Sequence, residues 1–279
     1  MYFQDNYSLF AAYHHRIVHL IIDEYVISAP NSSNGVFFNE YYSRNSALTA
    51  LDAIPQVNDW DIVLISDTDE IPHVNALSTL RQLYSDPTSD AANRIYKLFV
   101  DSYLYNFDCF VGDNSLRGTP LTATSIQLGR RLANAHPIYG ADRFPTYARL
   151  HLQHQQPIPY EHVIYPGGWH LSFFENIGRI KRKLASYGHQ IFAAQFVNNS
   201  NFSISVDSSG KEIVPQSVPA AESLSEEAIA SRVFSKQQID YRKHGSTCRK
   251  RELDQDTMLL KQMWESIATE DDLLVFEKE

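Results

Sequence analysis

The sequence predicts an α/β fold in which a mostly parallel central sheet is covered by helices on both sides. Two apolar runs of strand length, at residues 17–22 and 61–66, are each followed by a segment with helical periodicity. Strands and helices alternate in this way when parallel strands are joined by crossover helices. With 279 residues, of which 43% are hydrophobic, the chain is long enough to bury a sizeable core.

The helices expected in this first part cover residues 37–54 and the segment that begins at Pro72. The second of these helices places Val74, Leu77, Leu80 and Tyr84 on one face. Further along, aromatic and β-branched residues at 95–110 predict one or two strands, and residues 167–174 predict a strand that begins with glycines. Further helices are expected from Ile177 and at two C-terminal segments, 222–244 and 256–268.

Composition divides the chain into three parts. Residues 1–192 hold the strand and helix patterns of one α/β domain. Residues 193–224 are rich in Asn, Ser, Val and Pro, which is typical of a surface insertion or linker. Residues 225–279 are expected to form a C-terminal helical segment that packs on the same domain.

The charge balance argues against a general nucleic-acid binder. The formal net charge is −9, whereas such a protein needs a basic face. No stretch is apolar and long enough to predict a membrane-spanning helix, and no signal peptide is visible. The two cysteines, Cys109 and Cys248, are too few for a disulfide scaffold or a cysteine-rich zinc site. The sequence leaves open whether they form a disulfide with each other.

The most informative motif for function is Asp67-Thr68-Asp69-Glu70, which directly follows a predicted apolar strand. Ligand sites of open α/β sheets lie at the edge where parallel strands end, so this segment is expected to face a cleft. Two carboxylates that are separated by one residue can bind the same hard cation, such as Mg²⁺ or Mn²⁺. An acidic turn that caps the next helix is the alternative interpretation.

Residues 61–72 resemble the central motif of glycosyltransferase family 17, which contains the β-1,4-mannosyl-glycoprotein 4-β-N-acetylglucosaminyltransferase. Five further segments resemble motifs of the family in the same order, over about residues 1–192. These are Tyr2-Phe3-Gln4-Asp5-Asn6, His15-Arg16-Ile17-Val18-His19, Glu40 with Arg44, Gly168-Trp169-His170-Leu171-Ser172, and Lys183-Leu184-Ala185-Ser186 with His189.

The resemblance implies a GT-A-like, Rossmann-like nucleotide-sugar transferase fold and an inverting, metal-assisted reaction. The donor implied is UDP-N-acetylglucosamine, and the acceptor is a hydroxyl of a glycan or glycoprotein, as in N-glycan processing. Asp67 and Asp69 then hold Mn²⁺ or Mg²⁺ against the donor diphosphate, where the cation neutralises the developing charge. His170 is the third candidate metal ligand, with a core histidine as the alternative.

Three more residues are candidates for the site. Glu70 could act as the general base that deprotonates the acceptor, or it could hold a backbone amide. Arg44 could bind the diphosphate as a bidentate donor, or form a salt bridge with Glu40. Trp169 could stack on a sugar, or belong to the core.

A basic run near the end of this region, Arg179, Lys181, Arg182 and Lys183, could attract the anionic donor, or form a solvated helix face.

The chain also departs from the family. The stretch that precedes Tyr2-Phe3 in the family is missing, so an N-terminally truncated fold is expected. A degenerate, non-catalytic carbohydrate-binding protein is therefore one alternative. A Mg²⁺-dependent phosphatase of the haloacid-dehalogenase type is another, but Ile71 stands where that family requires Thr or Val. A Golgi-lumenal location is expected if a eukaryotic parent carries an anchor, and a cytoplasmic one otherwise.

Overall fold

The computed structural model describes residues 7–22, 51, 54–55, 57–86, 88–113, 121–129, 161–186, 205–206, 212–213, 225, 227 and 251–267. Its helices are η1 (Tyr7–Arg16), α3 (Val74–Ser85), η2 (Ala91–Asn93), α6 (Ile177–Ser186) and α9 (Gln255–Ile267). Its strands are β1 (Ile62–Ile65), β2 (Glu70–Pro72), β3 (Ile95–Leu104), β4 (Phe110–Asp113), β5 (Leu121–Ser125), β6 (Glu161–Ser172), β7 (Ser205–Val206) and β8 (Glu212–Ile213).

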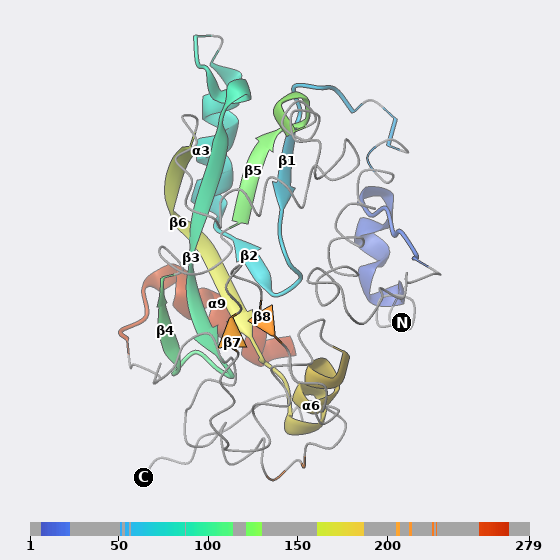
Figure 1. Ribbon diagram of the computed structural model, residues 1–279, viewed down its shortest axis with the longest axis vertical. Coiled ribbons are helices and arrows are strands. Elements are labelled where there is room, and N and C mark those ends of the chain that lie inside the picture. Colours follow the sequence, from blue (N-terminus) through green and yellow to red (C-terminus); the bar gives the residue numbers. More distant parts are fainter. Residues whose placement is uncertain are drawn as a thin grey trace.

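Six of these strands form one mixed sheet, in the order β1-β5-β3-β6-β2, with β4 paired to β3 (Figure 1). The strands β3 and β6 run parallel, and the other pairings of this sheet are antiparallel. The short strands β7 and β8 pair only with each other among the described strands. The chain is thus α/β, as predicted.

The predicted direction of the strands is wrong for the described part of the sheet, because most neighbours are antiparallel. The sequence alternates strand and helix only up to residue 90. Beyond that point the described residues between β3, β4 and β5 include no crossover helix of the kind that a parallel pair requires. As a result β1 is not a central parallel strand, and its one described partner is the antiparallel strand β5.

The helix α3 covers the half of the sheet formed by β3 and β5. Its buried residues Ala76 and Leu80 pack against an apolar cluster from these strands. The members of that cluster on the strands are Tyr96, Leu98, Val100, Leu121 and Ala123. The helix begins two residues after the predicted start at Pro72, because Pro72 ends β2 and His73 is the N-cap. Val74 is 66% exposed, so its predicted place on the buried face is wrong.

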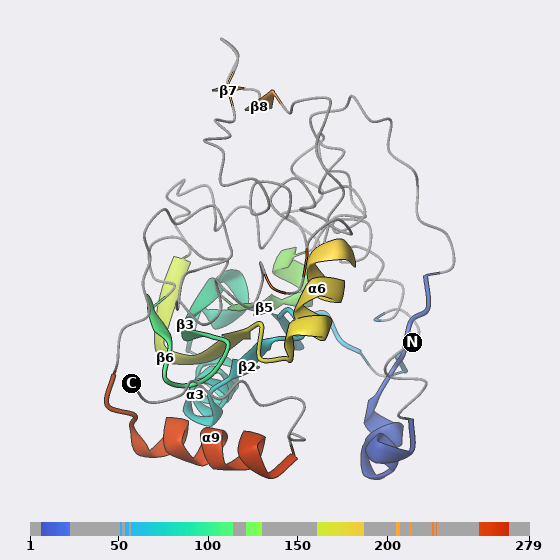
Figure 2. The same ribbon diagram turned by 90° about the horizontal axis from the view of Figure 1, so that it is seen from below.

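A second apolar cluster joins α9 to the other half of the sheet. Phe174 packs edge-on against Trp264 of α9, with 5.8 Å between the ring centroids. The indole N–H of Trp169 donates a hydrogen bond to Thr257, and His73 bonds to Asp256 over 2.9 Å. Figure 2 shows α9 on one side of β2 and β6 and α6 on the other. This helix is the predicted C-terminal helix, with bounds shifted by one residue.

Residues 17–22 do not form the predicted buried strand. They follow η1 without regular structure, and Val18 and Ile21 are 52% and 42% exposed. Apolar composition alone cannot make a strand, because a strand needs a neighbouring strand to pair with, and none of the described strands pairs with this segment.

The remaining local predictions have mixed outcomes. The strands expected at 95–110 are β3 and the start of β4, and the helix expected from Ile177 is α6. The glycine-led strand is the second half of β6, which begins at Glu161. The expected helices at 37–54 and 222–244 lie almost entirely outside the described residues, as does the expected linker, so the domain division stays a prediction. Cys109 is buried and disulfide-bonded, and Cys248 lies outside the described residues.

No helix in the described ranges combines the length and the apolar character that crossing a membrane requires.

Candidate functional site

The segment Asp67-Thr68-Asp69-Glu70 forms a tight turn between β1 and β2. The Glu70 amide donates to the Asp67 carbonyl over 3.1 Å, which closes the turn. The buried Glu70 carboxylate accepts the Asp67 amide over 2.7 Å. The Ser66 hydroxyl donates to the carbonyls of Asp67 and Glu70. Hydrogen bonds within residues 66–70 therefore hold the turn, and the side chains of Asp67 and Asp69 lie on its surface.

The antiparallel pairing of β2 with β6 brings this turn to His170. Glu70 lies directly opposite His170, and the Leu171 amide donates to the Asp69 carbonyl over 2.8 Å. Side chains of directly opposite residues share one face of a sheet, so Glu70 and His170 point to the same side. The predicted approach of His170 to the Asp-x-Asp segment is confirmed for Asp69, whose Oδ1 lies 3.6 Å from the ring Nε2.

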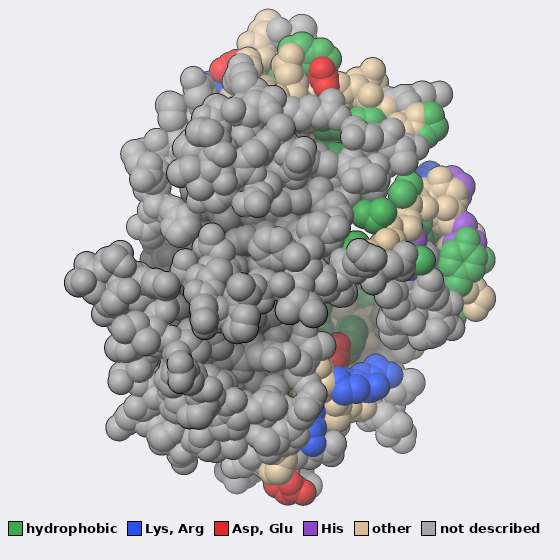
Figure 3. Space-filling model, turned by 45° about the vertical axis from the view of Figure 1, so that its right-hand side comes forward, with side chains coloured by type: hydrophobic (Ala, Val, Ile, Leu, Met, Phe, Trp, Pro, Cys, Tyr) green, Lys and Arg blue, Asp and Glu red, His purple; other side chains and the backbone are tan. Residues whose placement is uncertain are grey.

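Asp69 has a second cationic neighbour that the sequence analysis did not assign to it. The ammonium of Lys183, on α6, is 2.9 Å from Asp69 Oδ2. The side chains of Asp69, His170 and Lys183 are each 25% to 30% exposed, so the group is partly accessible to solvent. Figure 3 shows basic side chains beside an acidic one in the lower part of the face in view.

The pKa of Asp69 lies well below its usual range. Burial by itself raises this pKa, but the contact with the His170 ring and the charge of Lys183 together outweigh the burial. The carboxylate is therefore ionised through the neutral and mildly acidic range. Because its pKa is lowered on folding, the stability it contributes is present above the unfolded pKa, near 3.9, and is lost as the pH falls toward the folded pKa.

The ring of His170 also contacts Ser172, whose hydroxyl oxygen is 2.9 Å from Nε2. Both residues lie on β6 two positions apart, so they share a face of the strand. On β3 the residue opposite His170 is Ser102, which is 6% exposed and whose hydroxyl has no hydrogen-bond partner within the part of the chain that the structure describes. A polar row, Glu70, His170 and Ser102, thus crosses three neighbouring strands.

Trp169 lies on the opposite side of the sheet from His170, because consecutive strand residues alternate. Its bond to Thr257 and its place in the cluster with Phe174 and Trp264 support the core interpretation of this residue. A sugar-stacking role for Trp169 remains a prediction. Arg44, the other candidate for donor binding, lies outside the described residues.

The side chains of Asp69 and His170 provide some of the ligands that a divalent cation needs. Carboxylate and imidazole are ligands that Mn²⁺ accepts, and a cation with bonds of about 2.1 Å can bridge atoms as far apart as Asp69 Oδ1 and His170 Nε2. Across the described ranges, however, no three His, Cys, Asp or Glu side chains are already grouped around one metal position. Asp67 therefore does not join Asp69 and His170 in a ready-made cage, and its role as a ligand stays a prediction.

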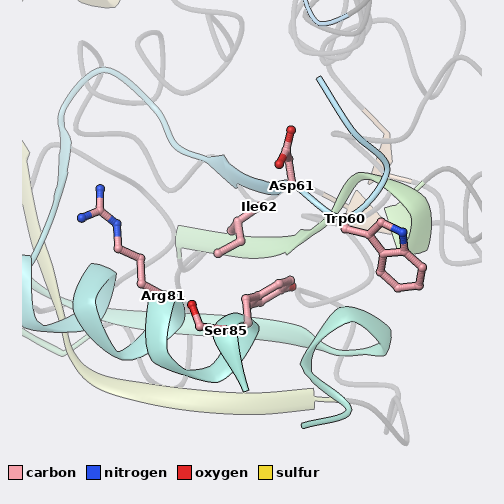
Figure 4. A pocket seen from close by; sticks show the side chains of 6 residues that line it. Trp60, Asp61, Ile62, Arg81 and Ser85 are labelled. Carbon is pink, nitrogen blue, oxygen red and sulfur yellow. The ribbon is translucent and has the colours of Figure 1, made fainter. Parts of the chain in front are cut away.

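An open pocket of about 400 Å³ lies at the other end of β1. Figure 4 shows Trp60 and Asp61 on one side of it and Arg81 and Ser85 of α3 on the other. Of the predicted site residues that the structure describes, none lines this pocket. Asp67 and Asp69 follow the C-terminal end of β1, whereas Asp61 precedes its N-terminal end.

Sequence reasoning named Lys183 only as part of a basic run that could attract the donor. It missed the contact of Lys183 with Asp69 and the contact of Ser172 with His170. Both residues stand in segments that resemble family motifs, yet a basic residue on an amphipathic helix usually indicates a solvated face. The signal for Ser172 is its two-residue spacing from His170 on a strand. No local signal shows that Lys183 reaches Asp69, because the two residues are 114 positions apart.

Comparison with known proteins gives one match. Residues 1–129 match the family model described as glycosyltransferase family 17. No curated protein and no solved structure matches the chain. The matched range includes the acidic turn but not β6 or α6, which the fold brings next to that turn. The match covers less than half of the chain, and it supports a glycosyltransferase of this family rather than a phosphatase.

Proposed function

We propose that this glycosyltransferase transfers N-acetylglucosamine from UDP-N-acetylglucosamine to a hydroxyl of a glycan, with inversion and with the help of a divalent cation. The observation that carries the proposal is the contact of Asp69 with His170. It joins the carboxylate of the matched acidic turn to an imidazole from a strand far along the chain. A carboxylate and an imidazole at one partly accessible point support a site for a cation and the phosphates that it binds.

The roles of the residues follow from their positions. Asp69 and His170 would hold Mn²⁺, and Asp67, two residues before Asp69 in the same turn, is the proposed third ligand. When bound, the cation supplies charge neutralisation at the departing diphosphate. Asp69 is ionised at neutral pH, which this role requires. The turn around Asp69 is held rigid by Ser66 and Glu70, so little reorganisation is needed when the donor binds.

The experiment that tests the proposal is an assay of UDP release from UDP-N-acetylglucosamine with a panel of glycan acceptors. We expect release that requires Mn²⁺ or Mg²⁺ and is abolished by EDTA. Replacing the donor with UDP-glucose and UDP-galactose in parallel tests the choice of sugar. Equal release with and without EDTA would contradict metal assistance, and preference for another donor would contradict the transfer of N-acetylglucosamine.

The role of Glu70 can be separated from that of Asp69. Its carboxylate accepts the Asp67 amide, which supports the interpretation that it holds the turn, although a role as general base stays a prediction. We expect Glu70→Gln to retain activity within about 10-fold, because the amide oxygen can still accept that bond. Loss of about 10²–10⁴-fold would instead indicate a general base. Glu70→Ala serves as the comparison, with an expected cost of about 1–3 kcal/mol in the free energy of unfolding, measured in urea.

A further inference from the structure

The ammonium of Lys183 lies where a bound cation would contact Asp69. It is 2.9 Å from Asp69 Oδ2, while Oδ1 of the same carboxylate faces His170. Two full positive charges so close together repel each other strongly in a partly buried site. A divalent cation at Asp69 and the ammonium in its present position therefore compete for one carboxylate.

The position of Lys183 is built into the fold rather than left to a mobile surface chain. Its ammonium lies over the ring of Phe173, 5.0 Å from the ring centroid. Phe173 directly follows β6 and has a φ of 59°, in the left-handed region that large side chains rarely adopt. Ile180, one helical turn before Lys183, is fully buried and anchors α6.

The strand β3, which pairs with β6, is also followed by a residue in the left-handed region. Tyr105 directly follows β3 and has a φ of 65°, and its amide donates to the Ser172 carbonyl over 3.0 Å. The rings of Tyr105 and Phe173 face each other at 6.3 Å. Unfavourable backbone conformations of this kind persist where the surrounding structure fixes them, and they cluster at functional sites.

We propose that Lys183 is a donor-binding residue that exchanges partners: it neutralises Asp69 in the free enzyme, and when a cation takes Asp69 the ammonium turns to the donor diphosphate. The inference rests on the proposed function, because it requires a cation and a nucleoside diphosphate at this site. An ammonium suits the exchange, since it is a point charge on a flexible stem that can bind either a carboxylate or a phosphate. Arg179 and Arg182, exposed on the same helix, add positive charge that favours an anion here.

The test compares Lys183→Met with the wild type by calorimetric titration, using Mn²⁺ alone and then UDP at saturating Mn²⁺. Lys183→Met is expected to bind Mn²⁺ about 10-fold more tightly, because no ammonium competes for Asp69. The same variant is expected to bind UDP about 10-fold more weakly, because a phosphate partner is lost. Opposite changes in the two affinities are the signature of the exchange, and a merely structural role of Lys183 does not produce them.

Lys181→Met is the matched control, because it removes the same charge from the same helix, and among the described residues Asp69 forms its ion pairs with His170 and Lys183 and not with Lys181. Thermal unfolding of both variants checks that the fold is kept. If Lys183→Met binds both ligands as Lys181→Met does, the exchange is refuted while the proposed function stands. If the wild type binds UDP equally well with and without Mn²⁺, the metal-assisted mechanism fails and the exchange fails with it. If the wild type binds neither ligand, both proposals are overturned.

Discussion

Asp69→Asn is expected to lower the rate of sugar transfer by about 10²–10³-fold, the usual cost of losing one preorganised electrostatic contact at a reacting centre. Asp69 contacts both His170 and Lys183. A neutral amide cannot hold a cation against a diphosphate, and it also leaves the Lys183 ammonium without its carboxylate. The measurement is UDP release from UDP-N-acetylglucosamine at saturating Mn²⁺.

The control for this variant is Asp61→Asn, the same chemical change at the other end of β1. Asp61 accepts the Asn58 amide through its side chain, and an asparagine oxygen can keep that bond. Asp61→Asn is therefore expected to have nearly wild-type activity. If the two variants lose activity to the same small extent, Asp69 has no special role in the reaction. Circular dichroism of both variants excludes unfolding as the cause of a difference.

Gly168→Ala is expected to lower the free energy of unfolding by about 3–5 kcal/mol, because it combines steric overlap with backbone strain. Gly168 has a φ of 148°, a conformation that residues with a side chain rarely adopt. A Cβ at this position would overlap the Ile71 carbonyl oxygen and lie 2.9 Å from the Pro72 Cα, both backbone atoms of the adjacent strand β2. The backbones cannot yield without moving β2 away from β6.

Gly112→Ala separates the two contributions. Gly112 has a similar φ of 135°, but a Cβ there would meet no atom within 4 Å. This variant therefore carries the backbone strain alone, and we expect it to cost about 1–2 kcal/mol. Urea denaturation of both variants measures the difference. Equal losses would show that β2 and β6 tolerate a larger separation, and would contradict the close approach that positions Asp69 beside His170.

Local patterns were sufficient for most of the described elements. Apolar runs and helical periodicity predicted β1, β3, α3, α6 and α9 within a few residues. These elements follow from the period of the hydrophobic residues, which a single segment carries by itself. The error at residues 17–22 has the same origin, since a run of apolar residues does not show whether a partner strand is present.

The sequence by itself indicated the family and the acidic turn that follows β1. It also indicated His170 as a neighbour of that turn, through a resemblance of short motifs, and the 3.6 Å contact with Asp69 confirms this. These properties reside in contiguous residues, so they can be recognised in the chain before it folds.

Tertiary structure alone decided the direction of the strands, the turn-holding bond of Glu70 and the contact of Lys183 with Asp69. The register of β2 on β6 sets the turn against His170, and the left-handed residue Phe173 then directs the chain toward α6. A contact between residues 114 positions apart depends on every strand pairing and turn between them. No local pattern encodes such a contact, because the free energy that fixes it comes from packing of the whole sheet.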